Sequence, residues 1–235
     1  MKKSYYGVTV GILMVETYFR RFVGDIGNAE TWPFPVQYKV VHGATPDKMG
    51  AFDEHDVLEP FRLAAMELIE GGCTAITTTC GFLGYYQKDL AKALPVPVAT
   101  SALLQVPIVE RIIQPDRTVG VLTYSAEKLT GPYLEACGAP ADSPVFGMDP
   151  GSEFCRSIRE GDPSVPYEVW EREVVETARA FAQAQPDLGA IVLECTNLTP
   201  FSHQISQATG LPVFDSISLV NWFRAGIVPS AYPHR

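Results

Sequence analysis

The stretch AITTTC at residues 75–80 returns as AIVLEC at residues 190–195, and each copy ends in a cysteine. Without a gap, the same offset also matches Leu83 with Leu198, Ala93 with Ala208, Pro97-Val98 with Pro212-Val213, Ser101 with Ser216 and Leu104 with Leu219. Short apolar runs at residues 10–13 and 119–122 begin the two halves in the same manner. Such self-similarity predicts two similar half-molecules, each carrying one cysteine, Cys80 or Cys195.

Short apolar segments alternate with helical patterns along the whole chain, which is typical of parallel βαβ units. Strands are predicted at 7–15, 36–41, 74–79, 118–123 and 189–194. Helices are predicted at 53–70, about 82–94, 101–113, 125–137, 166–184, after Thr199-Pro200, and at 216–225, and long loops at 24–35 and 149–166. The predicted fold is α/β, with two similar domains whose parallel sheets are related by a pseudo-twofold. The first domain is predicted to comprise 1–99 plus 216–235, and the second 100–215.

The composition is that of an ordinary globular protein, with 235 residues, 46% hydrophobic and 19% charged. A net charge of −9 and a pI near 4.9 argue against binding to nucleic acid or to an anionic membrane. No apolar run is long enough for a membrane helix. The five cysteines lack CxxC spacing, so neither a disulfide framework nor a zinc site is indicated, and a reducing cytoplasm fits best.

Both matched cysteines come directly after a predicted strand. In open parallel sheets, ligands bind outside the carboxyl ends of the strands, so Cys80 and Cys195 are expected in a cleft between the two domains. Each is also expected to precede a helix, where backbone N–H groups and the helix dipole lower the pKa of a thiol. A pair with one thiolate and one thiol is therefore expected at neutral pH.

The arrangement resembles the aspartate/glutamate/hydantoin racemase superfamily. The resemblance rests on Thr79-Cys80-Gly81 after one strand, on Cys195-Thr196-Asn197 after its counterpart, and on a duplicated organisation that covers nearly the whole chain. It implies catalysis by Cys80 and Cys195 without pyridoxal phosphate, metal or any other cofactor. One thiol would take a proton from one face of a carbon and the other would return a proton to the opposite face.

Neighbouring residues are expected to hold the substrate. The amides after each cysteine and the hydroxyls of Thr79 and Thr196 are candidates for binding a carboxylate or an enolate-like oxygen. Asn197 is expected either to touch the substrate or to cap the following helix. Tyr124 and Ser125 end the first strand of the second half and are expected to face the cleft. Further candidates are Glu16 and Thr17, which occupy the matching place in the first half. Arg20-Arg21 is a candidate for binding a distal carboxylate, but a solvated loop pair is the favoured prediction.

The chain departs from the amino-acid racemases of this superfamily at several positions. Gly81-Phe82 follows the first cysteine where those enzymes have Asn-Thr, and Gly81 is predicted to leave room for a bulkier substrate. Glu194 stands where a glycine is usual. These differences argue against aspartate or glutamate as substrate and favour a hydantoin or another acid with an activated α-hydrogen.

The predicted function is a cofactor-independent racemase or epimerase of a small carboxylate, amino acid or hydantoin. The alternatives are a maleate-type cis–trans isomerase with one nucleophilic thiol, a decarboxylase of the same superfamily, and a non-catalytic two-lobed binding protein. Decarboxylating relatives keep only the second cysteine, so Cys80 argues against that activity. The loop at 24–35 is predicted to cover the cleft or to form an oligomer contact, which leaves a homo-oligomer open.

Overall fold

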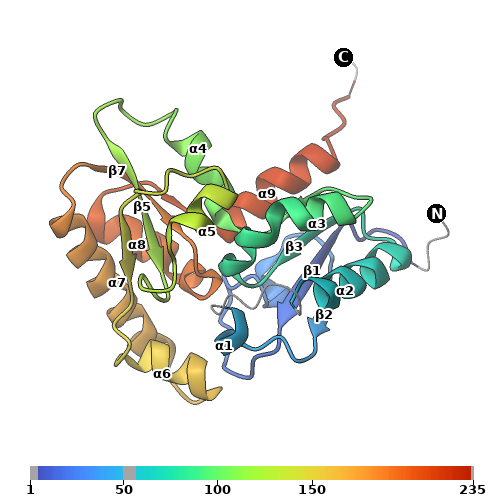
Figure 1. The fold of residues 1–235 in the computed structure, drawn as a ribbon, viewed down its shortest axis with the longest axis horizontal. Helices are drawn as coiled ribbons and strands as arrows, with labels where there is room; N and C mark the ends of the chain where they lie inside the picture. The colour runs from blue at the N-terminus through green and yellow to red at the C-terminus, as the bar shows by residue number, and fades with distance from the viewer. Residues whose placement is uncertain (1–4, 50–56, 234–235) are drawn as a thin grey trace.

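A computed structural model describes residues 5–49 and 57–233, and these contain two four-stranded sheets with the same strand order (Figure 1). The first sheet has the order β2-β1-β3-β4, with β1 at Val10–Val15, β2 at Val36–Val41, β3 at Ala75–Thr78 and β4 at Val98–Ala99. The second has the order β6-β5-β7-β8, with β5 at Thr118–Thr123, β6 at Val145–Gly147, β7 at Leu188–Leu193 and β8 at Val213–Phe214. Every pairing is parallel, which confirms the predicted α/β class.

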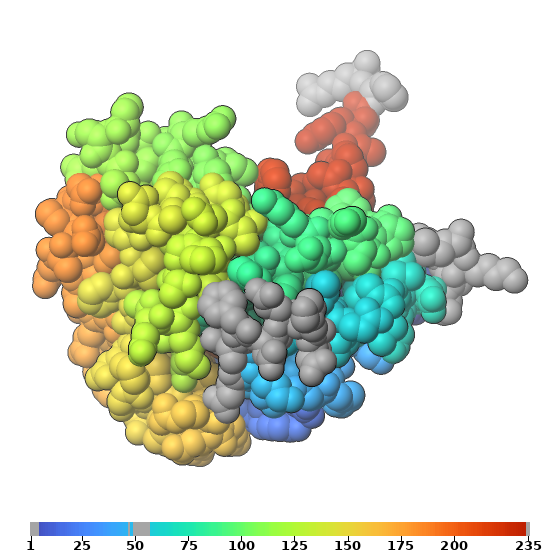
Figure 2. All heavy atoms as spheres, viewed as in Figure 1, coloured from blue at the N-terminus to red at the C-terminus, as the bar shows by residue number. Residues whose placement is uncertain are grey.

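The repeat seen in the sequence extends to the secondary structure. The offset that matches Cys80 with Cys195 also matches the 3-10 helices η2, Gly81–Tyr86, and η4, Thr196–Phe201. It matches β4 with β8 as well, and these two short strands escaped the sequence prediction. In the space-filling view the two halves adjoin, with green residues of the first half next to yellow-green residues of the second (Figure 2).

Helices cover both sheets. They are η1 at Ala29–Thr31, α1 at Pro46–Met49, α2 at Leu58–Gly71, α3 at Gln87–Ala93, η3 at Ala102–Gln105, α4 at Val106–Val109, α5 at Gly131–Ala136, α6 at Glu153–Glu160, α7 at Tyr167–Ala184, α8 at Ser202–Thr209 and α9 at Ser216–Ile227. On α7 the buried residues recur every three or four positions, as the amphipathic pattern predicted. Within the described ranges, every helix is too short or too polar to cross a bilayer.

Several predicted boundaries were wrong. The predicted loop 149–166 contains α6, because the Ser152 side chain caps its first turn and Gly161 ends it at φ 68°. Of the predicted helix 125–137 only α5 forms, and of 101–113 only η3 and α4. The region 82–94 begins as the 3-10 helix η2 before α3. Residues 53–56 of the predicted helix 53–70 lie outside the described residues.

The segment 24–35 is anchored in the core of the first half by two of its apolar side chains, and its role as a cover stays a prediction. Ile26 is fully buried, Trp32 is 7% exposed, and both pack in one cluster with Val10, Ile12 and Val220. The Trp32 Nε1–H donates to the carbonyl oxygen of Ile26 at 3.2 Å. Since Val220 belongs to α9, the C-terminal helix packs on the first sheet, as the duplication predicted. The domain bounds themselves stay a prediction.

Candidate active site

A pocket lies at the carboxyl ends of the central strands of both sheets. Val15 ends β1, Cys80 follows β3, Tyr124 follows β5, and Glu194-Cys195 follow β7. The space between the walls measures about 620 Å³, including open solvent at its mouth. Its lining residues are Val15, Thr17, Phe19, Arg21, Pro46, Thr79, Cys80, Gly81, Phe82, Tyr124, Lys128, Ile158, Glu194, Cys195, Thr196 and Asn197. This is where the parallel-sheet rule places a ligand.

Most of the residues proposed from the sequence meet in this pocket. Both cysteines line it, together with Thr79, Gly81, Phe82, Tyr124, Thr196 and Asn197. Ser125 is not among the lining residues. Glu16 is not among them either, because its carboxylate accepts hydrogen bonds from the Gly43 N–H at 2.8 Å and the Tyr18 hydroxyl at 3.0 Å. Thr17, its neighbour, does face the pocket.

Cys195 is buried and Cys80 is partly buried, and both thiols are less acidic than the sequence suggested. Burial and then the charge of Glu194 raise the pKa of Cys80 to about 12. The same causes raise the pKa of Cys195 well above its usual value. Backbone N–H groups of Phe82 and Leu83 do favour the Cys80 thiolate, as predicted, but they lower its pKa less than burial raises it. The surroundings of both cysteines therefore favour the thiol form of each, against the expected thiolate–thiol pair.

Glu194 is a site residue that the sequence marked only as an unusual neighbour of the second cysteine. Its side chain is fully buried, and Thr123 Oγ1 donates to its Oε2 at 2.6 Å. Among the described residues, Oε1 has no hydrogen-bond partner. Burial raises the pKa of this carboxyl to about 7, against the lowering effect of the Thr123 hydroxyl.

The absence of a side chain at Gly81 makes room for Glu194 and not for a larger substrate. A Cβ built on Gly81 would collide with the carbonyl oxygen and with Oε1 of Glu194. Glycine after the first cysteine and glutamate before the second therefore fit each other across the two halves. The prediction that Gly81 leaves space for a bulkier substrate was wrong, because sequence cannot show that a residue from the other half fills the space.

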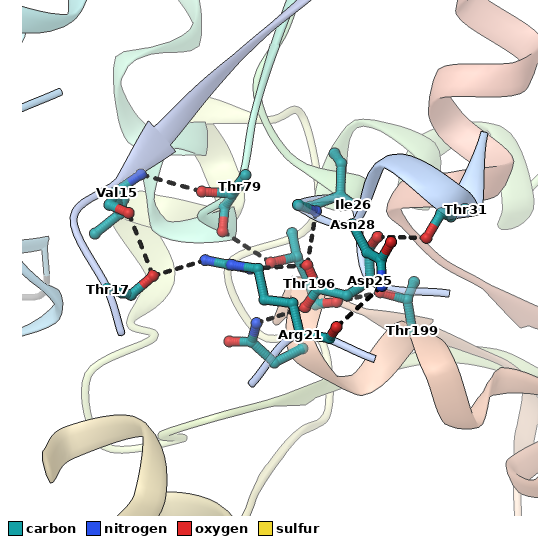
Figure 3. Close-up of polar contacts among 12 residues, drawn as sticks. Val15, Thr17, Arg21, Asp25, Ile26, Asn28, Thr31, Thr79, Thr196 and Thr199 are labelled. Atoms are coloured by element: carbon teal, nitrogen blue, oxygen red, sulfur yellow. Dashed lines mark hydrogen bonds and ion pairs between the residues drawn. The ribbon is translucent and has the colours of Figure 1, made fainter. Parts of the chain in front are cut away.

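A polar network joins the first half of the chain to the second cysteine, and Figure 3 shows the part of it around Arg21 and Asp25. Arg21 donates to Thr17 Oγ1 at 2.9 Å and to Asp25 Oδ1 at 2.8 Å, and its side chain is 11% exposed. Asn197 Nδ2 donates to Asp25 Oδ2 at 2.8 Å, and the Cys195 thiol donates to Asn197 Oδ1 at 3.6 Å. Arg21 thus lines the pocket with a largely enclosed side chain, and the favoured prediction of a solvated residue was wrong.

The two threonines hold the cysteine loops together. Thr196 Oγ1 donates to the Thr79 carbonyl oxygen at 2.8 Å, and Thr79 Oγ1 accepts from the Val15 N–H at 3.1 Å (Figure 3). The hydroxyl proton of Thr196 is therefore donated within the protein, and its role toward a substrate stays a prediction. No group of three or more metal-ligating side chains occurs in the described part of the chain.

No protein-family model matches the chain. The chain is 28% identical over 229 residues to a dimethylsulfoniopropionate lyase of Durusdinium sp. clade D. It is 30% identical over 236 residues to dimethylsulfoniopropionate lyase 3 of Emiliania huxleyi. Both alignments cover 94% of this chain, but they span 75% and 60% of the two relatives.

Solved structures with the same fold include a decarboxylase and racemases. Unliganded arylmalonate decarboxylase matches with a TM-score of 0.63 at 16% identity, covering 97% of this chain and 95% of the other. Glutamate racemase of Francisella tularensis in complex with D-glutamate matches at 0.60 and 16% identity, covering 94% and 81%. Allantoin racemase of Pseudomonas fluorescens matches at 0.58 and 16% identity, covering 94% and 90%. Relatives in sequence and in fold are thus named as enzymes.

Proposed function

Because the chain has the fold of the aspartate/glutamate/hydantoin racemase superfamily, we propose that it is an enzyme that removes the α-proton of a small carboxylate and then eliminates a leaving group from the β-carbon. The substrate class is a sulfonio-carboxylate such as dimethylsulfoniopropionate, on which the sequence relatives are named as acting. The observation that carries the proposal is one pocket lined by two thiols, a buried carboxyl and a largely enclosed guanidinium.

In this reaction a thiolate takes the α-proton and becomes a thiol. The electron pair of the C–H bond forms the carbon–carbon double bond, and the bond from the β-carbon to the sulfonium sulfur breaks. Its electron pair leaves with the sulfur as dimethyl sulfide, and the other product is acrylate. No change of oxidation state requires a redox cofactor.

Arg21 is the proposed anchor for the substrate carboxylate. Its side chain lines the pocket, and Asp25 and Thr17 hold it in one orientation through Nη1 and Nη2. A guanidinium held in this way binds a carboxylate without the entropic cost of first ordering its own side chain.

Cys195 is the proposed base for elimination. Its sulfur is linked to Arg21 through hydrogen bonds of Asn197 and Asp25. These bonds fix the position of the Cys195 sulfur, which takes the proton, relative to the Arg21 guanidinium, which binds the carboxylate. A sulfonium cation entering the pocket favours a thiolate, because an opposite charge nearby lowers the pKa of a thiol. The base is therefore expected to form when substrate binds and to remain a thiol in the empty site.

Racemisation is the second candidate, and the presence of Cys80 favours it. A racemase needs an acid/base group on each face of the reacting carbon, whereas an elimination needs one. Cys80 lines the pocket with Cys195, and charge on Cys80 raises the pKa of the Cys195 thiol.

The test is a substrate panel in deuterated water, containing dimethylsulfoniopropionate, the carboxylate analogues without a leaving group, amino acids and hydantoins. Dimethylsulfoniopropionate is expected to release dimethyl sulfide and acrylate, and the analogues without a leaving group are expected to incorporate deuterium at the α-carbon. Inversion of an amino acid or a hydantoin without elimination would show that the protein is a racemase and would contradict the proposed lyase function. If the compounds bind but none exchanges a proton, the protein is a non-catalytic two-lobed binding protein.

The Arg21 anchor gives a separate prediction. Arg21→Lys keeps a cation beside Asp25 but loses the two-pronged geometry, so KM for a carboxylate substrate should rise about tenfold to a hundredfold, equivalent to about 1.5–3 kcal/mol. Steady-state kinetics measure this, and thermal unfolding checks that the variant folds. Lys128→Gln is the matched control, since Lys128 also lines the pocket but is exposed. An equal effect of both substitutions would contradict an anchoring role for Arg21.

A further inference from the structure

Most polar side chains that line the described part of the pocket have hydrogen-bond partners within the protein. Thr17 Oγ1 accepts from Arg21 Nη2 at 2.9 Å and donates to a backbone carbonyl oxygen at 3.4 Å. Asn197 uses its amide nitrogen on Asp25 and its amide oxygen on the Cys195 thiol. The threonines next to the two cysteines bond to backbone groups of the protein. A ligand that carries hydrogen-bond donors therefore finds few free acceptors among these side chains.

Glu194 differs from these residues because its Oε1 has no hydrogen-bond partner among the described residues. Its side chain is nevertheless enclosed, since the residue is 0% exposed and a Cβ built on Gly81 would collide with Oε1. A donor on a ligand cannot reach an oxygen that has no exposed surface. Glu194 therefore acts on a ligand in the pocket through its charge and not through a hydrogen bond.

The side of the pocket that carries Cys195 is apolar and aromatic. Phe19, which follows β1, and Ile158 of α6 belong with Cys195 to one buried cluster, and Tyr124 packs against that cluster. All four residues line the pocket. The Tyr124 hydroxyl donates to the carbonyl oxygen of Cys155 in α6 at 3.3 Å, which holds the ring beside the helix that carries Ile158. We call Phe19, Tyr124 and Ile158 the apolar wall.

One member of the apolar wall already contacts a cation. The guanidinium carbon of Arg21 lies 4.7 Å from the centroid of the Phe19 ring, within the range of a cation–π interaction. A substrate whose carboxylate is held by Arg21 thus has that end beside Phe19. Tyr124 and Ile158 are the part of the apolar wall that remains for the opposite end of the substrate.

We propose that the apolar wall binds the cationic end of the substrate and accepts a fully alkylated cation, a sulfonium or a quaternary ammonium, in preference to a primary ammonium. A primary ammonium carries three N–H donors, and each one that leaves water without finding an acceptor weakens binding. A fully alkylated cation has no such donor, its methyl groups pack on apolar surface, and an aromatic ring attracts its charge. This inference rests on the proposed function, which supplies the carboxylate anchor.

Two cationic carboxylates that differ only at the cationic end test this selectivity with the wild-type protein. In 3-(trimethylammonio)propanoate the nitrogen carries three methyl groups, whereas in 3-aminopropanoate it carries three N–H donors. Isothermal titration calorimetry should show 3-aminopropanoate binding about tenfold or more weakly, because its donors lose water without gaining acceptors. Equal or tighter binding of 3-aminopropanoate would overturn the proposal.

Tyr124→Leu tests the aromatic part of the apolar wall, with 4,4-dimethylpentanoate as an uncharged ligand of the same shape as 3-(trimethylammonio)propanoate. Leucine is apolar but has no ring, so the cationic ligand should bind about threefold to thirtyfold more weakly, while the affinity for the uncharged ligand changes little. Tyr124→Phe is the matched control, because it keeps the ring and loses only the hydroxyl bond to Cys155. An equal loss for both ligands in Tyr124→Leu would contradict recognition of the cation by the ring.

Measuring binding and turnover separately distinguishes this inference from the proposed function. If the wild-type protein prefers 3-(trimethylammonio)propanoate to 3-aminopropanoate but releases no dimethyl sulfide from dimethylsulfoniopropionate, the elimination is wrong and the selectivity of the apolar wall stands. If it releases dimethyl sulfide but binds both cationic carboxylates equally well, the elimination stands and the selectivity of the apolar wall is wrong.

Discussion

Cys195→Ser is expected to lower the rate of elimination by about a thousandfold or more, while Cys80→Ser lowers it much less. A serine hydroxyl of ordinary acidity cannot replace a thiolate as base, and the loss of a positioned base costs roughly 10²–10⁴-fold. Cys195 is the thiol linked through Asn197 and Asp25 to the proposed carboxylate anchor. Release of dimethyl sulfide by each purified variant measures the effect.

The pair of cysteine variants also separates the candidate functions. A racemase would lose racemisation in both variants, and each variant would exchange the α-proton of the opposite enantiomer through its remaining thiol. A cis–trans isomerase would lose everything with its one nucleophile and would form an adduct with substrate. Cys155→Ser serves as control, because this buried thiol lies outside the pocket lining. Equal losses from Cys80→Ser and Cys195→Ser in elimination would contradict Cys195 as the single base.

Glu194→Gln is expected to make the folded protein more stable than the wild type at alkaline pH. Burial raises the pKa of Glu194 from 4.5 to about 7, so the folded state binds this proton more tightly than the unfolded state. The contribution to stability is fully present below about pH 4.5 and is lost as the pH rises through 7. Ionising the buried carboxyl then costs roughly 3 kcal/mol, at about 1.4 kcal/mol per pKa unit.

Unfolding in urea at pH 5 and pH 8 measures this difference. The stability gained by Glu194→Gln should be larger at pH 8 by an amount on the order of 3 kcal/mol, or roughly 5–10 °C in Tm. Glu135→Gln, at an exposed position of the second half, should leave the pH dependence unchanged. The same pH dependence in wild type and Glu194→Gln would show that the carboxyl does not titrate in this range.

The duplicated organisation and the position of the cysteines could be predicted from the sequence because both depend on local patterns. Apolar runs of strand length and the constant sequence offset between the two halves place Cys80 and Cys195 after β3 and β7. Parallel sheets bring the carboxyl ends of their strands to one edge, so the meeting of these residues follows from topology alone. The helix α6 was missed because Gly and Pro residues around it concealed a short helix with its own cap at Ser152.

What the sequence by itself determined is the duplicated α/β fold and the pair of thiols at its centre. Only the tertiary structure decided the environment of those thiols. Arg21 is buried because Asp25 and Thr17 enclose it, and Asp25 is held in turn by Asn197, far away in the sequence. Gly81 is filled by Glu194 of the other half. The pKa of a thiol or carboxyl depends on burial and on nearby charges, and these are set by residues that local sequence patterns do not bring together.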